Sequence, residues 1–108
     1  MEKITFKYST LKEAIERFVD ELYGFDYGYK VVLNFWSDGS ISNTGIISYN
    51  SDIIYNDPPV FQYWERCTQD DDDKTDEDIQ ASKDFYFDFI YNKIKENLPK
   101  NIEIDFEN

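Results

Sequence analysis

One stretch decides the fold, residues 29–49, and it reads YKVVLNFWSDGSISNTGIISY. Its first half has an apolar centre, Val31-Val32-Leu33, which is typical of a buried strand. A hairpin turn follows at Ser37-Asp38-Gly39-Ser40, because glycine tolerates the positive φ that tight turns require. The chain then returns as a second strand from Ile41 to Tyr49, in which Gly45 indicates a β-bulge. We therefore expect an antiparallel hairpin over residues 29–49.

The residues before the hairpin predict a strand followed by a helix. Ile4, Phe6 and Tyr8 alternate with polar residues, which is the pattern of a half-buried strand. Thr10 and Glu13 have the spacing of a capping box, in which two side chains satisfy free amides at a helix start. Apolar residues then recur at helical spacing, and glycine at position 24 is a typical stop. The first helix is thus expected over about residues 10–24.

The residues after the hairpin are less regular. Ile53 to Tyr55 are expected to form a short third strand, which Pro58-Pro59 ends. Val60 to Trp64 are aromatic and predict either an edge strand or an extended arm. The next segment, residues 65–75, is rich in aspartate, and adjacent like charges resist compaction. We expect this segment to be an exposed acidic loop.

A second helix is predicted over about residues 75–98. Thr75 is a good cap, and the acids that follow it lie in the first turn, where the helix dipole favours negative charge. An apolar face runs from Ile79 to Leu98, and Pro99 ends the helix. Alternation over residues 102–107 predicts a last strand. The whole chain, residues 1–108, is thus expected to be a single α+β domain. It would contain a mostly antiparallel sheet of three to five strands with two helices packed on one face.

The charge balance limits the classes of partner. The chain has 23 acidic and 11 basic residues, a formal net charge of -12, yet 19% of its residues are aromatic, which favours a folded core. Such a charge repels nucleic acid and anionic membrane surfaces, and it attracts basic proteins. A single cysteine, Cys67, excludes an intrachain disulfide, and no apolar run approaches a membrane span. We expect a cytoplasmic protein without direct contact to nucleic acid or membrane.

The absence of histidine argues against catalysis. It excludes Ser-His-acid triads, Cys-His pairs, histidine metal ligands and a histidine general base. No phosphate-binding loop or dinucleotide fingerprint is present. The run Asp70 to Asp73 lacks the alternating ligands and central glycine of a calcium loop. The sequence therefore predicts no enzyme activity, no cofactor and no metal site, although carboxylate chemistry stays open.

The candidate binding surface follows the acidic segment into the second helix. Glu77, Asp84 and Asp88 would share one stripe, roughly 16 Å long at about 1.5 Å rise per residue. Carboxylates four residues apart on a helix lie about 6 Å apart, close to the spacing of phosphates along a nucleic-acid strand. Acids at positions 13, 16 and 20 would form a similar stripe on the first helix. Such stripes are also what a solvated helix face looks like.

Aromatic residues beside the stripe are candidate anchors, because aromatic side chains carry much of the energy at many protein interfaces. Whether these residues are core or interface stays open from the sequence. The complete predicted partner-binding set is Asp70, Asp71, Asp72, Asp73, Asp76, Glu77, Asp84, Asp88, Phe85, Phe89 and Trp64.

These features predict an acidic inhibitor that binds a basic nucleic-acid-binding or nucleic-acid-cleaving protein by imitating nucleic-acid charge. Phage-encoded anti-CRISPR proteins and immunity proteins of nuclease toxins have this size and charge, and the likeness is one of class, without a shared motif. The first alternative is a structural or adaptor domain whose acidity serves only solubility. The second is a small enzyme or ligand-binding module that uses carboxylates and tyrosines.

Overall fold

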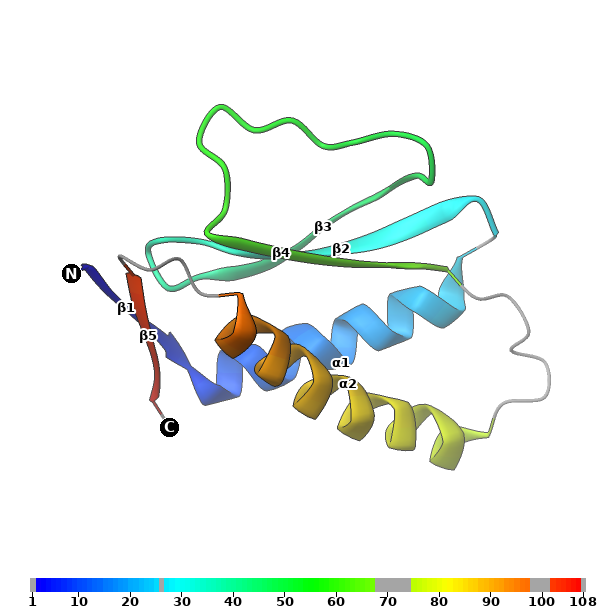
Figure 1. Ribbon diagram of the computed structural model, residues 1–108. Helices are drawn as coiled ribbons and strands as arrows, with labels where there is room; N and C mark the ends of the chain where they lie inside the picture. Colours follow the sequence, from blue (N-terminus) through cyan, green and yellow to red (C-terminus); the bar gives the residue numbers. More distant parts are fainter. Residues whose placement is uncertain (1, 26, 68–74, 98–101, 108) are drawn as a thin grey trace.

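The computed structural model describes residues 2–25, 27–67, 75–97 and 102–107. Figure 1 shows two helices on one side of a three-stranded sheet, with the segment between the second and third of these strands crossing its other side. This arrangement confirms the predicted α+β class. The elements in chain order are β1 (Glu2–Lys7), α1 (Tyr8–Gly24), β2 (Tyr29–Phe35), β3 (Ile41–Ser48), β4 (Phe61–Arg66), α2 (Asp76–Glu96) and β5 (Ile102–Glu107).

The three-stranded sheet has the order β3-β2-β4, and β2 pairs antiparallel with both neighbours. The predicted hairpin is confirmed, with Phe35 opposite Ile41 at the turn. The predicted bulge is confirmed as well. Pairing moves from Val31 opposite Ile46 to Leu33 opposite Asn43, so two residues of β3 face one residue of β2. β2 is therefore the central strand, and both edges belong to its partners.

The first and last strands form a separate ribbon. β1 and β5 pair in parallel, with Ile4 opposite Ile104, and they make no ladder with the larger sheet. The β2–β3 turn lies against this ribbon at Gly39, where φ is +87°. A Cβ atom at Gly39 would lie 2.5 Å from the backbone oxygen of Thr5. Glycine is therefore required at this turn both for its backbone conformation and for the close approach to β1.

The core lies between the helices and one face of the sheet. Alternate residues of β2 point toward the helices, because successive side chains of a strand point to opposite faces. These are Val31, Leu33 and Phe35, all buried. From the helices, the buried apolar residues are Leu11, Ala14, Ile15, Phe18, Val19 and Leu22 of α1 and Ile90 and Ile94 of α2.

The start of α2 agrees with the sequence. Thr75 is the N-cap, its hydroxyl accepts from the backbone amide of Asp78, and the Asp78 carboxylate accepts from the amide of Thr75, each at 3.2 Å. These reciprocal bonds satisfy two donors that a helix start otherwise leaves free. Charged residues recur along the helical part of the described chain, where neither helix is long and apolar enough to cross a membrane.

The predicted start of α1 is wrong. The helix begins at Tyr8, two residues early, and Lys7 at its N-cap makes no side-chain capping bond. β1 leads directly into the helix, so Thr10 already lies inside its first turn and cannot cap it. The ring of Tyr8 instead packs 5.0 Å from that of Phe87 in α2. The predicted capping box at Thr10 and Glu13 therefore does not form at the start of α1, although the helix predicted over about residues 10–24 is confirmed. Gly24 ends the helix, as predicted.

The predicted strand at Ile53 to Tyr55 is also wrong. These residues form no ladder and belong to the segment that crosses the outer face of the sheet. The side chain of Tyr55 reaches β2, where its hydroxyl accepts from the amide of Asn34 at 3.1 Å, whereas Ile54 is exposed. The aromatic segment that follows does form an edge strand, β4. It continues to Arg66, and Cys67 after it is buried, so the first residues of the predicted acidic loop belong to the sheet.

Candidate functional site

The outward side of α2 carries the predicted carboxylates. Asp76, Glu77, Asp84 and Asp88 are all exposed. Asp84 accepts a hydrogen bond of 3.4 Å from the carboxamide of Gln80, one turn earlier. Within the described ranges none of the four forms an ion pair. Asp76 and Glu77 lie in the first turn, where their negative charges interact favourably with the helix dipole. Asp84 and Asp88 lie too far along the helix for that role.

The structure separates the two phenylalanines of the predicted surface. Phe85 is 61% exposed, which is high for a large aromatic side chain. Phe89 is half-buried, packs against the core, and lies 5.8 Å from the ring of Tyr63 in β4. The two phenylalanine rings stack at 5.7 Å with an interplanar angle of 20°. Phe89 is thus part of the core edge, and it supports Phe85 as an exposed aromatic residue.

A groove of about 330 Å³ lies between α1 and α2, and the acidic stripes of both helices border it. Asp84 and Asp88 line it from α2, and Glu16 lines it from α1. The sequence predicted two separate stripes, and the packing of the helices brings one member of the first, Glu16, to the same groove as two members of the second, Asp84 and Asp88. The full lining consists of Tyr8, Lys12, Ile15 and Glu16 from α1 and Gln80, Lys83, Asp84, Phe87 and Asp88 from α2.

The groove also contains lysines, and one of them is neutralised. The ammonium of Lys83 lies 3.1 Å from the carboxylate of Asp20 on α1, and its side chain is mostly buried. This ion pair links the two helices, and the carboxylate of Asp20 offsets the positive charge of Lys83. Lys12 remains opposed by Glu16 and by the two aspartates of α2. The groove is therefore net negative.

Other members of the predicted set lie elsewhere. Trp64 is 43% exposed, and it points to the face of the sheet opposite the helices, as the alternating burial of β4 shows. It therefore does not share a surface with α2. Asp70, Asp71, Asp72 and Asp73 lie outside the described residues.

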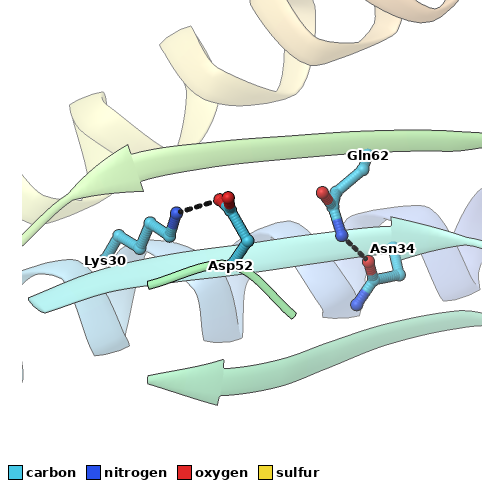
Figure 2. Close-up of polar contacts among 4 residues, drawn as sticks. All are labelled: Lys30, Asn34, Asp52 and Gln62. Atoms are coloured by element: carbon cyan, nitrogen blue, oxygen red, sulfur yellow. Dashed lines mark hydrogen bonds and ion pairs between the residues drawn. The ribbon is translucent and has the colours of Figure 1, made fainter. Parts of the chain in front are cut away.

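A second candidate site lies on that outer face, and our sequence analysis missed it. Lys30 and Asn34 are buried polar residues of the central strand, four residues apart and on the same face of the sheet. The ammonium of Lys30 lies 3.5 Å from a carboxylate oxygen of Asp52, and Gln62 donates to Asn34 at 2.7 Å (Figure 2). The sequence does contain a signal for this site, because lysine and asparagine are seldom buried within a strand. The segment that covers them has no regular pattern that would reveal it.

Phenols and a thiol are buried between the helices and β4. The hydroxyl of Tyr63 donates a short hydrogen bond to the carboxylate of Glu65, and burial together with this contact raises the pKa of Tyr63. Burial, with Glu65 nearby, raises the pKa of Tyr86 to about 12. Burial also raises the pKa of the Cys67 thiol, and Glu21 adds to that shift. At neutral pH these groups are therefore hydrogen-bond donors, not nucleophiles or bases.

Neither a metal-binding group nor a similarity to a known protein assigns a function to these residues. Within residues 2–25, 27–67, 75–97 and 102–107, no three acidic or cysteine side chains are grouped in a way that could hold a metal ion. No protein-family model, curated protein or solved structure matches the chain.

Proposed function

We propose that this protein is a non-catalytic inhibitor that binds a basic nucleic-acid-binding or nucleic-acid-cleaving protein and fills its nucleic-acid site with carboxylates. One observation carries the proposal, the convergence of Glu16 from α1 with Asp84 and Asp88 from α2 on a single groove. Carboxylates four residues apart on one helix are about 6 Å apart. Two helices therefore present acids at a spacing that suits a row of lysines and arginines on a partner.

The neighbourhood of the groove supports binding instead of solubility alone. Phe85 and Phe87 are two residues apart and so point about 200° apart around the helix axis. Phe87 lines the groove, so exposed Phe85 lies on the other flank of the stripe. A partner that covers Asp84 and Asp88 would also cover Phe85, and burial of this ring would add apolar contact to the ion pairs.

The net charge of -12 acts at longer range. It speeds encounter with a basic surface, and it does so less as salt is added, because the Debye length is about 8 Å at physiological ionic strength. Small acidic inhibitors of two classes fit this description, phage proteins that block CRISPR or other defence nucleases and immunity proteins that neutralise nuclease toxins. Both act in the cytoplasm, and we place this protein there. Asp70 to Asp73, which precede α2 in the sequence, belong to the proposed partner-binding set.

The test is capture followed by displacement. The immobilised full chain is incubated with lysate at about 50 mM salt, and bound proteins are then eluted with a short DNA duplex or with single-stranded RNA. The proposal expects basic nucleic-acid-binding proteins that leave when nucleic acid is added, because both ligands would compete for one site. Proteins that stay bound under nucleic acid would place the contact away from a nucleic-acid site and contradict the proposal.

A charge-reversed variant and a matched control locate the surface. Asp84→Lys with Asp88→Lys changes the charge by four and should abolish capture, since it reverses the rim of the groove. Asp57→Lys with Asn50→Lys and Asn56→Lys makes the same change at exposed positions of the segment that joins β3 to β4, on the other side of the sheet from the helices. The control should retain most of the capture, losing only long-range attraction. Equal loss in both variants would mean that only total charge matters. Salt-independent capture in both would favour an adaptor whose acidity serves solubility.

A further inference from the structure

A cavity of about 260 Å³ lies on the outer face of the sheet, under the segment that joins β3 to β4. Lys30 and Val32 of β2, Ile47 of β3, and Gln62 and Trp64 of β4 form its floor and wall. At about 30 Å³ per water, the cavity has the volume of roughly nine water molecules. It is therefore too small for a peptide or a nucleotide and suits a single-ring molecule.

The ammonium of Lys30 is poorly compensated for a buried charge. Its side chain is 7% exposed, whereas that of Asp52, 3.5 Å away, is 92% exposed. Among the residues the structure describes, Asp52 is its only ionic partner, and the ring of Trp64 lies beneath it at 4.7 Å. An ammonium has three donors, and burying it is unfavourable unless acceptors surround it. The site thus holds a mostly buried cation, whose carboxylate partner is exposed, beside a flat aromatic ring.

The rest of the cavity is held in place by hydrogen bonds. Gln62 donates its amide to the carbonyl of Asn34, and Asn34 donates to the hydroxyl of Tyr55. Figure 2 shows both polar pairs along β2, with Asp52 between the Lys30 ammonium and Gln62. The bonds of Gln62 and Asn34 therefore fix one end of the cavity, and the Lys30–Asp52 pair lies at the other.

The local charge on this face differs from that of the whole chain. The guanidinium of Arg66 stacks 3.8 Å above the ring of Tyr49, whose ring lies 5.8 Å from Trp64. Lys30 and Arg66 thus flank Trp64, while Glu65 points to the opposite face. Asp52 is the one carboxylate that lines the cavity, and its exposure leaves it free to swing into solvent.

We propose that this cavity binds a small aromatic anion, a carboxylate or phosphate on a single ring, independently of the acidic groove. The anionic group would accept from Lys30 in the place that Asp52 now occupies, and the ring would pack on Trp64. Asp52 thus stands in for the ligand, as an internal carboxylate that a better-placed anion displaces.

The test uses four matched probes, benzoate and phenyl phosphate as anions, benzamide as the neutral analogue and benzylamine as the cation. Each is titrated into the full ¹⁵N-labelled chain, and amide and indole chemical shifts report binding. The proposal expects at least one anion to bind with a Kd of about 1 mM or tighter, shifting the Lys30 amide and the Trp64 indole. Binding of benzoate alone assigns a carboxylate ligand, and binding of phenyl phosphate alone assigns a phosphate. Equal shifts from benzamide, or none from either anion, would overturn it.

Variants separate a ligand site from a structural ion pair. Asp52→Asn removes the competing carboxylate at an exposed position, and it should tighten anion binding about threefold to tenfold. Lys30→Met should weaken binding at least tenfold, whereas Lys83→Met, at another lysine that pairs with an aspartate, should leave it unchanged. If Lys30→Met fails to fold, Asp52→Asn still decides. Unchanged or weaker anion binding in Asp52→Asn contradicts the proposal, since the two carboxylates would then not share one position.

Discussion

The two outer surfaces of this protein differ in the burial and the hydrogen bonding of their polar residues. The outward side of α2 carries Asp84 and Asp88, which are exposed and form no ion pair among the described residues, and Asp84 accepts a long hydrogen bond from Gln80. The outer face of the sheet buries its polar residues and connects them, Asn34 to Tyr55 and Gln62, and Lys30 to Asp52. Polar groups on the first surface are surrounded by water, and those on the second depend on each other.

This difference separates stability from function. A buried, connected polar group cannot be removed without leaving a partner unsatisfied, so its loss destabilises the fold. An exposed and unpaired carboxylate contributes almost nothing to folding, so its presence calls for another explanation, either solubility or binding. The helix side is thus the better place to look for a macromolecular partner. The predictions below test the contrast through the free energy of unfolding.

The largest effect is expected at Asn34. This side chain is fully buried and bonded at both ends. Asn34→Ala should lower the free energy of unfolding by about 2–3 kcal/mol, through two lost hydrogen bonds and the space left behind. Urea denaturation at pH 7 measures the change. Asn92→Ala is the matched control at an exposed position of α2, where alanine also favours the helix, so a change within about 0.5 kcal/mol is expected there. Equal losses of stability in the two variants would contradict the difference between the buried and the exposed polar residues.

A smaller effect is expected at Thr75, whose hydroxyl and backbone amide both bond to Asp78 at the start of α2. Thr75→Ala removes one bond of the capping box and should lower the free energy of unfolding by about 1 kcal/mol. Thr10→Ala should change it by less than about 0.5 kcal/mol, because Thr10 does not cap α1. Chemical denaturation of both variants distinguishes the cap that exists from the one that the sequence suggested. A larger loss at Thr10 would contradict the observed start of α1.

The stability of the protein at alkaline pH tests the burial of the Tyr86 phenol in the helix layer. The pKa of Tyr86 is raised to about 12 in the folded protein, while a phenol in the unfolded chain ionises near 10. The unfolded chain therefore releases this proton first as pH rises. The stabilisation is complete below about pH 10 and is lost between about pH 10 and 12. Tyr86→Phe should make the decline of stability above pH 10 less steep, measured by urea unfolding at pH 9, 10 and 11. An identical slope in both proteins would refute this role.

The sequence predicted most of the elements because their signals are local. The hairpin follows from the turn around Gly39, the bulge from Gly45 and the start of α2 from Thr75. Each of these depends on backbone conformation or on residues within one turn of each other. The start of α1 was missed for the opposite reason. Tyr8 packs on Phe87, some eighty residues along the chain, and no local pattern reveals such a contact.

The candidate sites show the same limit. Sequence periodicity placed Asp84 and Asp88 on the exposed side of α2, and the structure agrees. It did not bring Glu16 to the same groove, because that depends on how the two helices pack. It also included Trp64 among the aromatic anchors of the same surface, whereas Trp64, in the edge strand β4, points to the other face of the sheet. The covering of Lys30 by an irregular segment likewise leaves no periodic signal.

The smallest effect is expected at the carboxylates of the proposed binding surface. Asp84→Asn with Asp88→Asn should change the free energy of unfolding by no more than about 0.5 kcal/mol at physiological salt. At about 10 mM salt the change should be stabilising, because the folded chain, with a net charge of -12, repels itself and screening is weak. Unfolding curves at the two salt concentrations measure both values. A clear loss of stability would show that these acids have partners within the fold, and their exposure would then no longer point to binding.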